Sequence, residues 1–365
     1  MNQSCPSLNQ SASEARFDPV SGNWILYSVG RRERPIEYQR APKSLDTQPP
    51  CPFCPDYEHQ TPPTLWSGKE KAGQIYSNER SALNNPLGSN DWSVRVFANR
   101  YPALSSDSCR EKVNKTGNDE HFLQTVGGHE VIVDTRQHTD LIAQTTVGES
   151  RLLFLAIRDR INTWNENNGI EHISVFKNSG GAAGASMTHS HCQLIATNYL
   201  PGNIQHQLQR MNSHLHQMGE CLICSMTKSE IADRKRVICE TEEVIAYSPY
   251  ASAFPFQVRL TSKTHLAQFE KLSEATLHEC AILTRNLIIA LQEMHPTVSY
   301  NLIFSTLPKK QHSHHKAFHW SIDLCPRITS FAGYEIATGS MINTVLPEDA
   351  ARTYRSCIKK KGFES

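Results

Sequence analysis

Three polar side chains directly follow a loop of small residues near the middle of the chain. His189, His191 and Gln193 are spaced two residues apart, after the run 178–188, which is rich in glycine and alanine. If residues 188–197 form a strand, alternate side chains point to one face, so these three share a face. Small residues such as Gly180 and Gly181 let backbone N–H groups approach an anion. The stretch therefore predicts a phosphate-binding active site.

A neutral imidazole at this place can act as a nucleophile toward phosphorus. Attack by a ring nitrogen of His191 gives a phosphoramidate and divides one transfer between phosphates into two displacements. The other ring nitrogen then needs a fixed acceptor to set the tautomer, and a backbone carbonyl suits this purpose. Gln193 can donate a hydrogen bond to a phosphate oxygen without titrating. The alternative is that the histidine strand is only a metal-bound strand of the core.

Cysteine and histidine recur in the same order in the two halves of the chain. Each half has a Cys-x-x-Cys pair followed by two histidines, which are 51 residues apart in the first half and 54 in the second. Tetrahedral zinc accepts two thiolates and two imidazoles, and a complete set leaves no position for a substrate, so both zinc ions are predicted to be structural. The ligand sets are Cys51, Cys54, His138 and His189, and Cys221, Cys224, His265 and His319.

An internal duplication explains this recurrence. Aligning His189 with His319 places Ser321 opposite His191 and Asp323 opposite Gln193, so the reaction should belong to the first half. Expected strands lie at 24–27, 93–97, 130–133, 173–176 and 188–197, and again at 244–250, 258–260, 300–304 and 318–324. Helices are expected at 146–165, where Thr146 and Glu149 have capping-box spacing, and at 273–294. Residues 1–12, 55–91, 104–122 and 198–216 are expected to be loose or irregular.

The composition is that of a globular protein with room for two domains in its 365 residues. The net charge is +1, so nothing indicates a nucleic-acid or membrane partner. There is no run of eighteen apolar residues, and residues 1–7 do not look like a secretory signal, so a cytoplasmic protein is expected. Four of the eleven cysteines lie in the two pairs, which predicts thiols and zinc rather than disulfides. A zinc-stapled binding module without a reaction is an alternative, which the balanced charge disfavours.

Residues 178–193 resemble the active-site signature of the galactose-1-phosphate uridylyltransferases, which belong to the histidine-triad superfamily. The shared pattern is Asn-x-Gly-x-x-x-Gly-x-Ser-x-x-His-x-His-x-Gln, and the likeness extends to 18–24 and 99–104. The resemblance implies an α+β fold of two tandem histidine-triad-like halves, each an antiparallel sheet with flanking helices. These halves would span 14–200, with the nucleophile and one zinc site, and 215–352, with the second metal site and sugar-binding residues. It also implies a homodimer.

The resemblance further implies ping-pong nucleotidyl transfer from a nucleotide sugar to phosphate or a sugar phosphate. His191 would form the nucleotidyl-histidine, and Gln193 would hold the phosphates. The other implied contacts are Asn178 and Ser186 on the phosphate side, Asn99 and Arg100 at the nucleoside, Arg31 and Arg34 at the phosphates, and Tyr334 and Glu335 at the sugar hydroxyls. Without the resemblance, the basic cluster 31–34 is equally well explained as a solvated loop.

Several departures from the uridylyltransferase pattern favour the ADP-glucose phosphorylase branch, which transfers AMP to phosphate. Ser190 in place of the usual proline, the second Cys-x-x-Cys pair and the Thr-Gly-x-x-Ile-Asn-x-x-x-Pro-Glu-Asp run at 338–349 look more like that branch. Arg100, where aspartate is usual, is a further departure from the uridylyltransferase pattern. The sequence thus favours adenylyl transfer, with galactose-1-phosphate uridylyl transfer as the alternative. A histidine-triad hydrolase or dinucleoside-polyphosphate enzyme is a further alternative, although those hydrolases usually carry a third histidine in place of Gln193.

Overall fold

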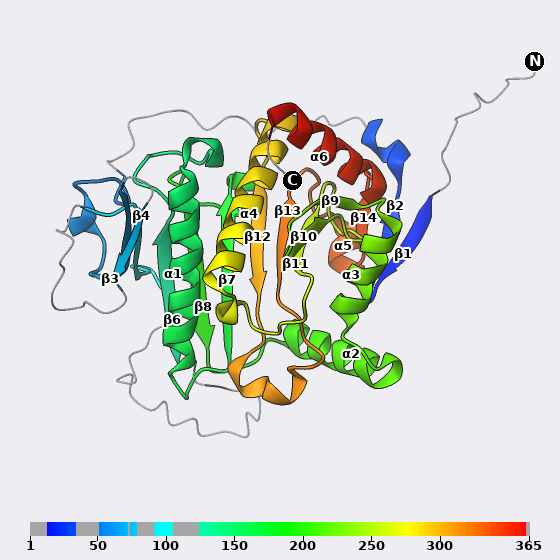
Figure 1. The fold of residues 1–365 in the computed structure, drawn as a ribbon, viewed down its shortest axis with the longest axis horizontal. Helices are drawn as coiled ribbons and strands as arrows, with labels where there is room; N and C mark the ends of the chain where they lie inside the picture. Colours follow the sequence, from blue (N-terminus) through cyan, green and yellow to red (C-terminus); the bar gives the residue numbers. More distant parts are fainter. Residues whose placement is uncertain are drawn as a thin grey trace, which may run out of the picture.

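One antiparallel sheet dominates the structure (Figure 1). The computed structural model describes residues 13–33, 51–71, 74–78, 91–104, 123 and 125–362. Within these residues the sheet has eleven strands. From one edge to the other they are β4 (Gln74–Asn78), β3 (Thr64–Lys71), β5 (Val94–Ala98), β6 (Gly127–Val133), β8 (His191–Thr197), β7 (His172–Ser179), β12 (Tyr300–Ser305), β13 (Ser321–Pro326), β11 (Val258–Ser262), β10 (Val244–Tyr247) and β9 (Val237–Glu240).

The strand order repeats in reverse on the two sides of the β7–β12 pair. The set β5-β6-β8-β7 corresponds to β10-β11-β13-β12, and each set places one long helix between its second and third strands in the chain. These helices are α1 (Val147–Asn165) and α4 (Glu274–Met294). The α+β fold of two similar halves is therefore confirmed. The two half-sheets also join into one continuous sheet, because β7 and β12 pair from Ser179 and Tyr300 to Val175 and Phe304.

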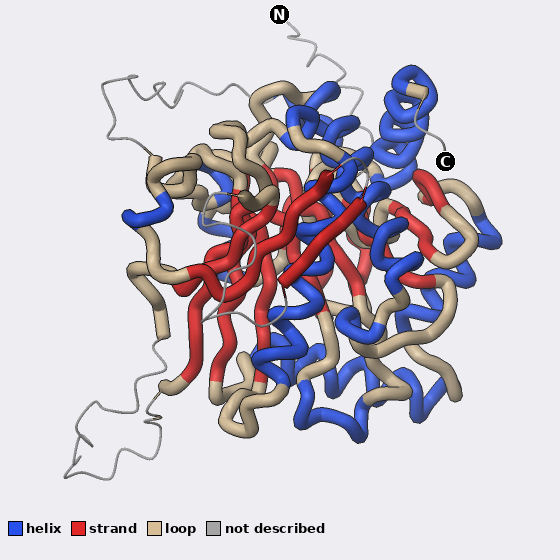
Figure 2. The backbone as a smooth tube through the Cα atoms, turned by 60° about the vertical axis from the view of Figure 1, so that its left-hand side comes forward, coloured by secondary structure: helices blue, strands red, loops and turns tan. Residues whose placement is uncertain are grey.

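The helices α1 and α4 cover one face of this sheet, and the main core lies beneath them (Figures 1 and 2). Side chains alternate across a strand, so Cys192 and Leu194 of β8 point into this core, while their odd-numbered neighbours point to the other face. The capping box predicted for α1 is present: Thr146 Oγ1 accepts from the Glu149 N–H at 3.0 Å, and Glu149 Oε2 accepts from the Thr146 N–H at 2.8 Å. α6 (Pro347–Lys361) packs against α4.

The opposite face of the sheet carries smaller elements. α2 (Gly202–Met218) and α3 (Leu222–Asp233) share one apolar cluster there. A second sheet, of β1 (Glu14–Asp18), β2 (Asn23–Tyr27) and β14 (Met341–Asn343), lies with α5 (Gly333–Thr338) beside the C-terminal half, where the Tyr27 hydroxyl donates to the Ser252 carbonyl at 3.1 Å. The boundaries 14–200 and 215–352 stay a prediction. The short 3-10 helices are η1 (Val29–Glu33), η2 (Glu58–Gln60), η3 (Ile142–Gln144), η4 (Gly181–Ala183), η5 (Phe269–Lys271) and η6 (Lys309–His314).

Three expectations about local structure were wrong. Residues 55–91 contain β3 and β4 rather than only irregular chain. Residues 198–216 include most of α2, a polar helix that buries only Leu208 and Met211, although Gly219 in the left-handed conformation marks its end. The strand expected from residue 188 begins only at His191, because the Ser190 N–H donates to the Thr139 carbonyl in a loop instead of to a neighbouring strand. The segments 1–12 and 105–122 lie outside the described residues.

No helix in the described residues combines the length and the apolar surface that a bilayer crossing requires.

His172 gives a stability prediction that depends on pH. It is buried at the start of β7, and burial lowers its pKa to about 4, against about 6.5 in an unfolded chain. Between these values the unfolded chain binds a proton that the folded chain does not, so the free energy of unfolding decreases as pH falls. From pH 7 to pH 5 we expect the wild type to lose about 2 kcal/mol more than a His172→Gln variant.

Urea unfolding of both proteins at the two pH values measures this difference. Acid effects on other groups are common to both proteins and cancel, so equal losses would show that His172 takes up no proton on unfolding.

Candidate active site

His191 is the first residue of β8 and is buried, with 6% of its surface exposed. Its Nδ1 donates to the His189 carbonyl oxygen at 2.9 Å, which confirms the predicted backbone acceptor and leaves the Nε2 lone pair available. The Phe53 ring packs edge-on against the imidazole, with 5.3 Å between ring centroids. Burial lowers the pKa of His191, which favours the neutral form. The ring therefore has the tautomer and the protonation state of a nucleophile.

A buried ionic network lies behind this imidazole. Lys177 at the end of β7 pairs with Asp134 just after β6, and Ser190 Oγ accepts from Lys177 Nζ at 2.6 Å and donates to Asp134 Oδ2 at 2.8 Å. All three side chains are at least 95% buried. Burial alone would lower the pKa of Lys177, but Asp134 together with Cys192 and Tyr300 raises it by more, so the lysine is charged. The network fixes the residue between His189 and His191.

The peptide between His189 and Ser190 is held at both ends. Its carbonyl accepts from His191, and its N–H donates to the Thr139 carbonyl at 2.8 Å. Proline at position 190 has no N–H and no hydroxyl, so it could make neither this bond nor those of the buried network. Hydrogen bonds to its N–H and hydroxyl thus fix the backbone at Ser190, where a proline ring would fix it by its own rigidity.

The small-residue loop before β8 is tightly folded. Gly180 has a φ of +80°, and a Cβ there would lie 2.2 Å from Ser299 Oγ, so the position requires glycine. The N–H groups of residues 182–185 already donate to the carbonyls of Gly180 and Gly181 or to Ser299 Oγ. In this conformation these four N–H groups are not free to bind a phosphate. Ser186 is exposed in the same loop, and Asn178 Oδ1 accepts from Asn301 Nδ2 at 2.9 Å across the β7–β12 pair.

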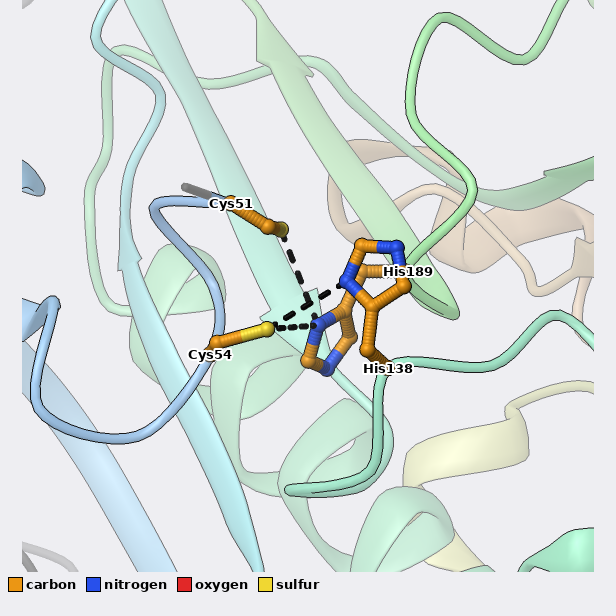
Figure 3. A group of neighbouring side chains, drawn as sticks. All are labelled: Cys51, Cys54, His138 and His189. Carbon is orange, nitrogen blue, oxygen red and sulfur yellow. Dashed lines mark hydrogen bonds between the residues drawn. The ribbon is translucent and has the colours of Figure 1, made fainter. Parts of the chain in front are cut away.

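The first predicted ligand set forms a compact cluster next to the nucleophile (Figure 3). The sulfurs of Cys51 and Cys54 face Nδ1 of two histidines from other segments, with Cys54 Sγ 3.3 Å from His138 and 3.5 Å from His189. The four donor atoms lie within 4.8 Å of one another. Tetrahedral zinc with bonds of about 2.0–2.3 Å places its ligand atoms about 3.3–3.8 Å apart, so the cluster fits a metal ion.

The second ligand set forms a matching cluster in the C-terminal half. Cys221 and Cys224 lie at the start of α3, and Cys224 Sγ is 3.3 Å from Nδ1 of both His265 and His319. Its four donor atoms also lie within 4.8 Å of one another. The outer nitrogens of all four histidines are held by oxygen atoms: Thr188 Oγ1 for His138, the Thr135 carbonyl for His189, the His315 carbonyl for His265 and Ser262 Oγ for His319.

Gln193 meets a residue that the sequence did not single out. Its Oε1 lies 2.8 Å from Nε2 of His129 on β6, and the His129 carbonyl accepts from the Asn99 N–H at 2.7 Å. Asn99 and Gln193 are thus brought together, as expected for two parts of one nucleotide site. The side chain of Arg100 is exposed and donates to the Gln60 carbonyl at 3.3 Å. His129 lies just before the strand expected at 130–133, and the observed strand β6 begins earlier, at Gly127, and so includes it.

Three other predicted residues lie elsewhere. Arg31 is exposed in η1, after β2, and Tyr334 and Glu335 lie on α5 next to β14. α5 lies by β10 and β14 in the C-terminal half and η1 follows β2, whereas β8 lies in the N-terminal half of the sheet (Figure 1). A single chain therefore does not bring them to His191. Arg34 lies outside the described residues.

The corresponding place in the C-terminal half is filled by an ion pair. Arg259 and Asp323 stand opposite each other on β11 and β13, as Val131 and Gln193 do on β6 and β8. The guanidinium donates to both carboxylate oxygens, at 3.0 and 3.1 Å, and both residues are buried. With serine at the nucleophile position and this pair beside it, the second half has no group equivalent to His191.

A cavity of about 270 Å³ is lined in part by Phe176, the β7 residue that pairs with Gln193. Ile303, which lies opposite Phe176 on β12, also belongs to its wall. Ser174, Ser305 and Gln207 of α2 add polar groups. The cavity has the size and mixed polarity of a small-molecule site.

Comparison with known proteins relates the chain to nucleotide-sugar enzymes. The sequence profile described as galactose-1-phosphate uridyl transferase, N-terminal domain, matches residues 4–201, and one described as a domain of unknown function matches residues 110–360. An ADP-glucose phosphorylase of Arabidopsis thaliana is 28% identical, over 96% of this chain and 94% of that protein. A galactose-1-phosphate uridylyltransferase of Thermotoga maritima is 24% identical, over 94% of this chain and 98% of that protein.

Solved structures show the same fold. The crystal structure of an ADP-glucose phosphorylase from Arabidopsis thaliana with bound ADP-glucose matches with a TM-score of 0.77 and 27% identity, covering 94% of this chain and 99% of that one. A uridylyltransferase structure matches with a TM-score of 0.69 and 19% identity, covering 96% of this chain and 99% of that one.

The buried network gives a stability prediction. Lys177→Met leaves the Asp134 carboxylate buried without its cation, which should lower the free energy of unfolding by about 3–5 kcal/mol. The double variant Lys177→Met/Asp134→Leu removes both charges and should lose clearly less than the single variant. Urea unfolding of the three proteins at pH 7 measures this. A double variant as unstable as the single one would mean that packing, not the unpaired charge, determines the loss.

Proposed function

Because the chain belongs to the galactose-1-phosphate uridyl transferase family, we propose that it is a nucleotidyltransferase that acts through a covalent intermediate on His191. It transfers a nucleoside monophosphate from a nucleotide sugar to phosphate or a sugar phosphate. The observation that carries the proposal is the hydrogen bond from His191 Nδ1 to the His189 carbonyl, which leaves Nε2 as the nucleophilic atom. Gln193 on the same face supports binding of the phosphates, and the cavity lined by its β7 partner Phe176 supports binding of the sugar or acceptor.

The reaction follows from this geometry in two displacements. In the first, the Nε2 lone pair of His191 attacks the α-phosphorus, the bond to the bridging oxygen breaks, and the sugar 1-phosphate leaves with the electron pair. Positive charge then develops on the imidazole, and the His189 carbonyl that accepts from Nδ1 stabilises it. In the second, an acceptor phosphate oxygen attacks phosphorus and the N–P bond breaks. The free imidazole is restored.

Within this reaction class we favour adenylyl transfer over uridylyl transfer. The relative of 28% identity is an ADP-glucose phosphorylase, and the fold matches its complex with ADP-glucose at a TM-score of 0.77. Ser190 stands where the uridylyltransferase pattern has proline, and its hydroxyl is held by Lys177 and Asp134. This departure from the pattern also favours the adenylyl reaction. Uridylyl transfer to galactose 1-phosphate is the second candidate, which the Thermotoga maritima relative supports.

We propose zinc as the ion of both Cys/His clusters. Two thiolates and two imidazoles with the observed donor spacing suit tetrahedral zinc, and a complete set leaves no open position for a substrate. Each ion would therefore be structural and take no part in a reaction step. None of the nine cysteines in the described residues is in a disulfide, so all four ligand thiolates are available for zinc.

A homodimer would complete the site. Arg31, Tyr334 and Glu335 lie on η1 and α5, far from the His191 of their own chain (Figure 1). A two-fold axis could place η1 and α5 of each chain on the open sheet face of the other chain. Each of the two sites would then combine His191 of one chain with the η1 and α5 residues of its partner. The half-exposed Phe331 and Tyr334, and Ile336, which is 78% exposed, give the region of α5 apolar surface for such a contact.

The identity of the donor can be tested by labelling. The protein is incubated separately with ADP-glucose and UDP-glucose without acceptor, and its intact mass is measured. We expect a gain of one AMP with ADP-glucose, and no gain in a His191→Gly variant. A gain only with UDP-glucose would establish the uridylyl reaction. Turnover of a donor at the same rate with and without an acceptor would instead identify a hydrolase.

The shared site can be tested by complementation. His191→Gly chains and Tyr334→Ala/Glu335→Ala chains are co-expressed with different tags, and the mixed dimers are purified. If each site combines His191 of one chain with α5 of the other, one site in each mixed dimer is intact, so about half of the wild-type activity should return. No recovery above the two parent variants would mean that α5 does not serve the partner's site.

A further inference from the structure

His129 lies between the nucleoside segment and the phosphate-binding glutamine. On one side, its Nδ1 is 3.2 Å from the Ala103 N–H nitrogen, and its carbonyl accepts from the Asn99 N–H at 2.7 Å. On the other side, its Nε2 is 2.8 Å from Gln193 Oε1. One side chain thus contacts both parts of the nucleotide site proposed above.

The backbone contact determines which ring nitrogen carries the proton. The Ala103 N–H can only donate, so Nδ1 of His129 must accept and carries no hydrogen. In the neutral ring Nε2 then carries the hydrogen and is a donor. Gln193 Oε1 at 2.8 Å is its acceptor. The Asn99 Nδ2 group, 3.2 Å away, is itself a donor, because Asn99 Oδ1 faces the Tyr101 N–H at 2.9 Å, and so it does not compete for this hydrogen.

This tautomer fixes the amide orientation of Gln193. With Oε1 occupied by His129, the Nε2 amide group is the end that remains for a ligand. That end can donate to a phosphate oxygen, whereas a flipped amide would present Oε1 and repel it. Gln193 shares the sheet face of His191, two residues away on β8, so its amide lies beside the reacting phosphate.

We propose that His129 is a positioning residue, which holds the Gln193 amide in the donating orientation and couples it to the nucleoside segment 99–103. The proposal rests on the proposed nucleotidyl transfer through His191. It adds a group that touches neither phosphate nor sugar but determines how strongly Gln193 stabilises the charge that develops on the phosphate. A nucleotide that orders residues 99–103 would thereby also order the phosphate-binding side chain.

Removal of the imidazole should lower the rate of transfer more than it weakens binding. In His129→Leu the Gln193 amide can turn, so we expect the rate of nucleotidyl-His191 formation to fall about tenfold, less than the roughly hundredfold loss expected for Gln193→Ala. The dissociation constant of the donor should change by less than about threefold, because only the transition-state contact is lost. His129→Gln can place an amide donor where Nε2 stood, so it should recover most of the rate.

A double-mutant cycle tests whether His129 acts through Gln193. Single-turnover rates of adduct formation with ADP-glucose are measured for the wild type, His129→Leu, Gln193→Ala and the double variant. If the proposal holds, His129→Leu has no further effect once Gln193 is absent. If the rate losses of the two single variants multiply in the double variant, or if His129→Leu leaves the rate unchanged, the proposal is wrong.

Two controls separate this test from other outcomes. Thermal unfolding by circular dichroism and donor binding by calorimetry are measured for every variant, and a folded His129→Gln that stays as slow as His129→Leu would contradict the role of the donor. The wild type itself tests the proposed function: if it forms an adduct only with UDP-glucose, the cycle is run with that donor. If it forms none with either, nucleotidyl transfer fails, and the positioning role fails with it.

Discussion

The ion pair between Lys177 and Asp134 is the constraint on which the site depends. A buried charge without its partner costs several kcal/mol, so the segments that carry the two charges cannot separate. These segments are the end of β7 and the start of the loop that carries His138, and Ser190 joins them from between His189 and His191. One buried network thus holds the first Cys/His cluster, His191 and the beginning of the small-residue loop in fixed relation.

The same framework serves different purposes in the two halves. In each half, one histidine of the Cys/His cluster lies two residues before a strand, His189 before β8 and His319 before β13. In the first half the following positions hold His191 and Gln193, whereas in the second the Arg259–Asp323 pair fills the space with a fully paired salt bridge. The duplicated fold therefore supplies two Cys/His clusters but only one histidine at the position of His191, and α5 and β14 follow the second half.

In each of three histidines of the site, a hydrogen bond to the backbone determines which ring nitrogen carries the hydrogen. His191 donates through Nδ1 to a carbonyl, which frees Nε2, while His189 donates through Nε2 to the Thr135 carbonyl, which frees Nδ1 for a metal. His129 accepts a backbone N–H on Nδ1 and therefore donates through Nε2. The three histidines thus differ in which ring nitrogen donates, accepts or stays free, because each is oriented by a different neighbour.

The sequence by itself predicted the two-fold repeat and the two Cys/His sets that the structure brings together, and it pointed to His191 as the nucleophile, because each prediction rests on particular residue types at spacings that recur or fail to recur along the chain. It did not reveal α2, a helix with only two fully buried side chains, or that four N–H groups of the small-residue loop are already used, three within the loop and one on Ser299. Only the tertiary structure decided that β7 and β12 join the half-sheets, that the 14–27 hairpin lies beside the other half, and that His129 holds Gln193. These features depend on strand register and on contacts between segments distant in the chain, which patterns of residue type within one segment do not specify.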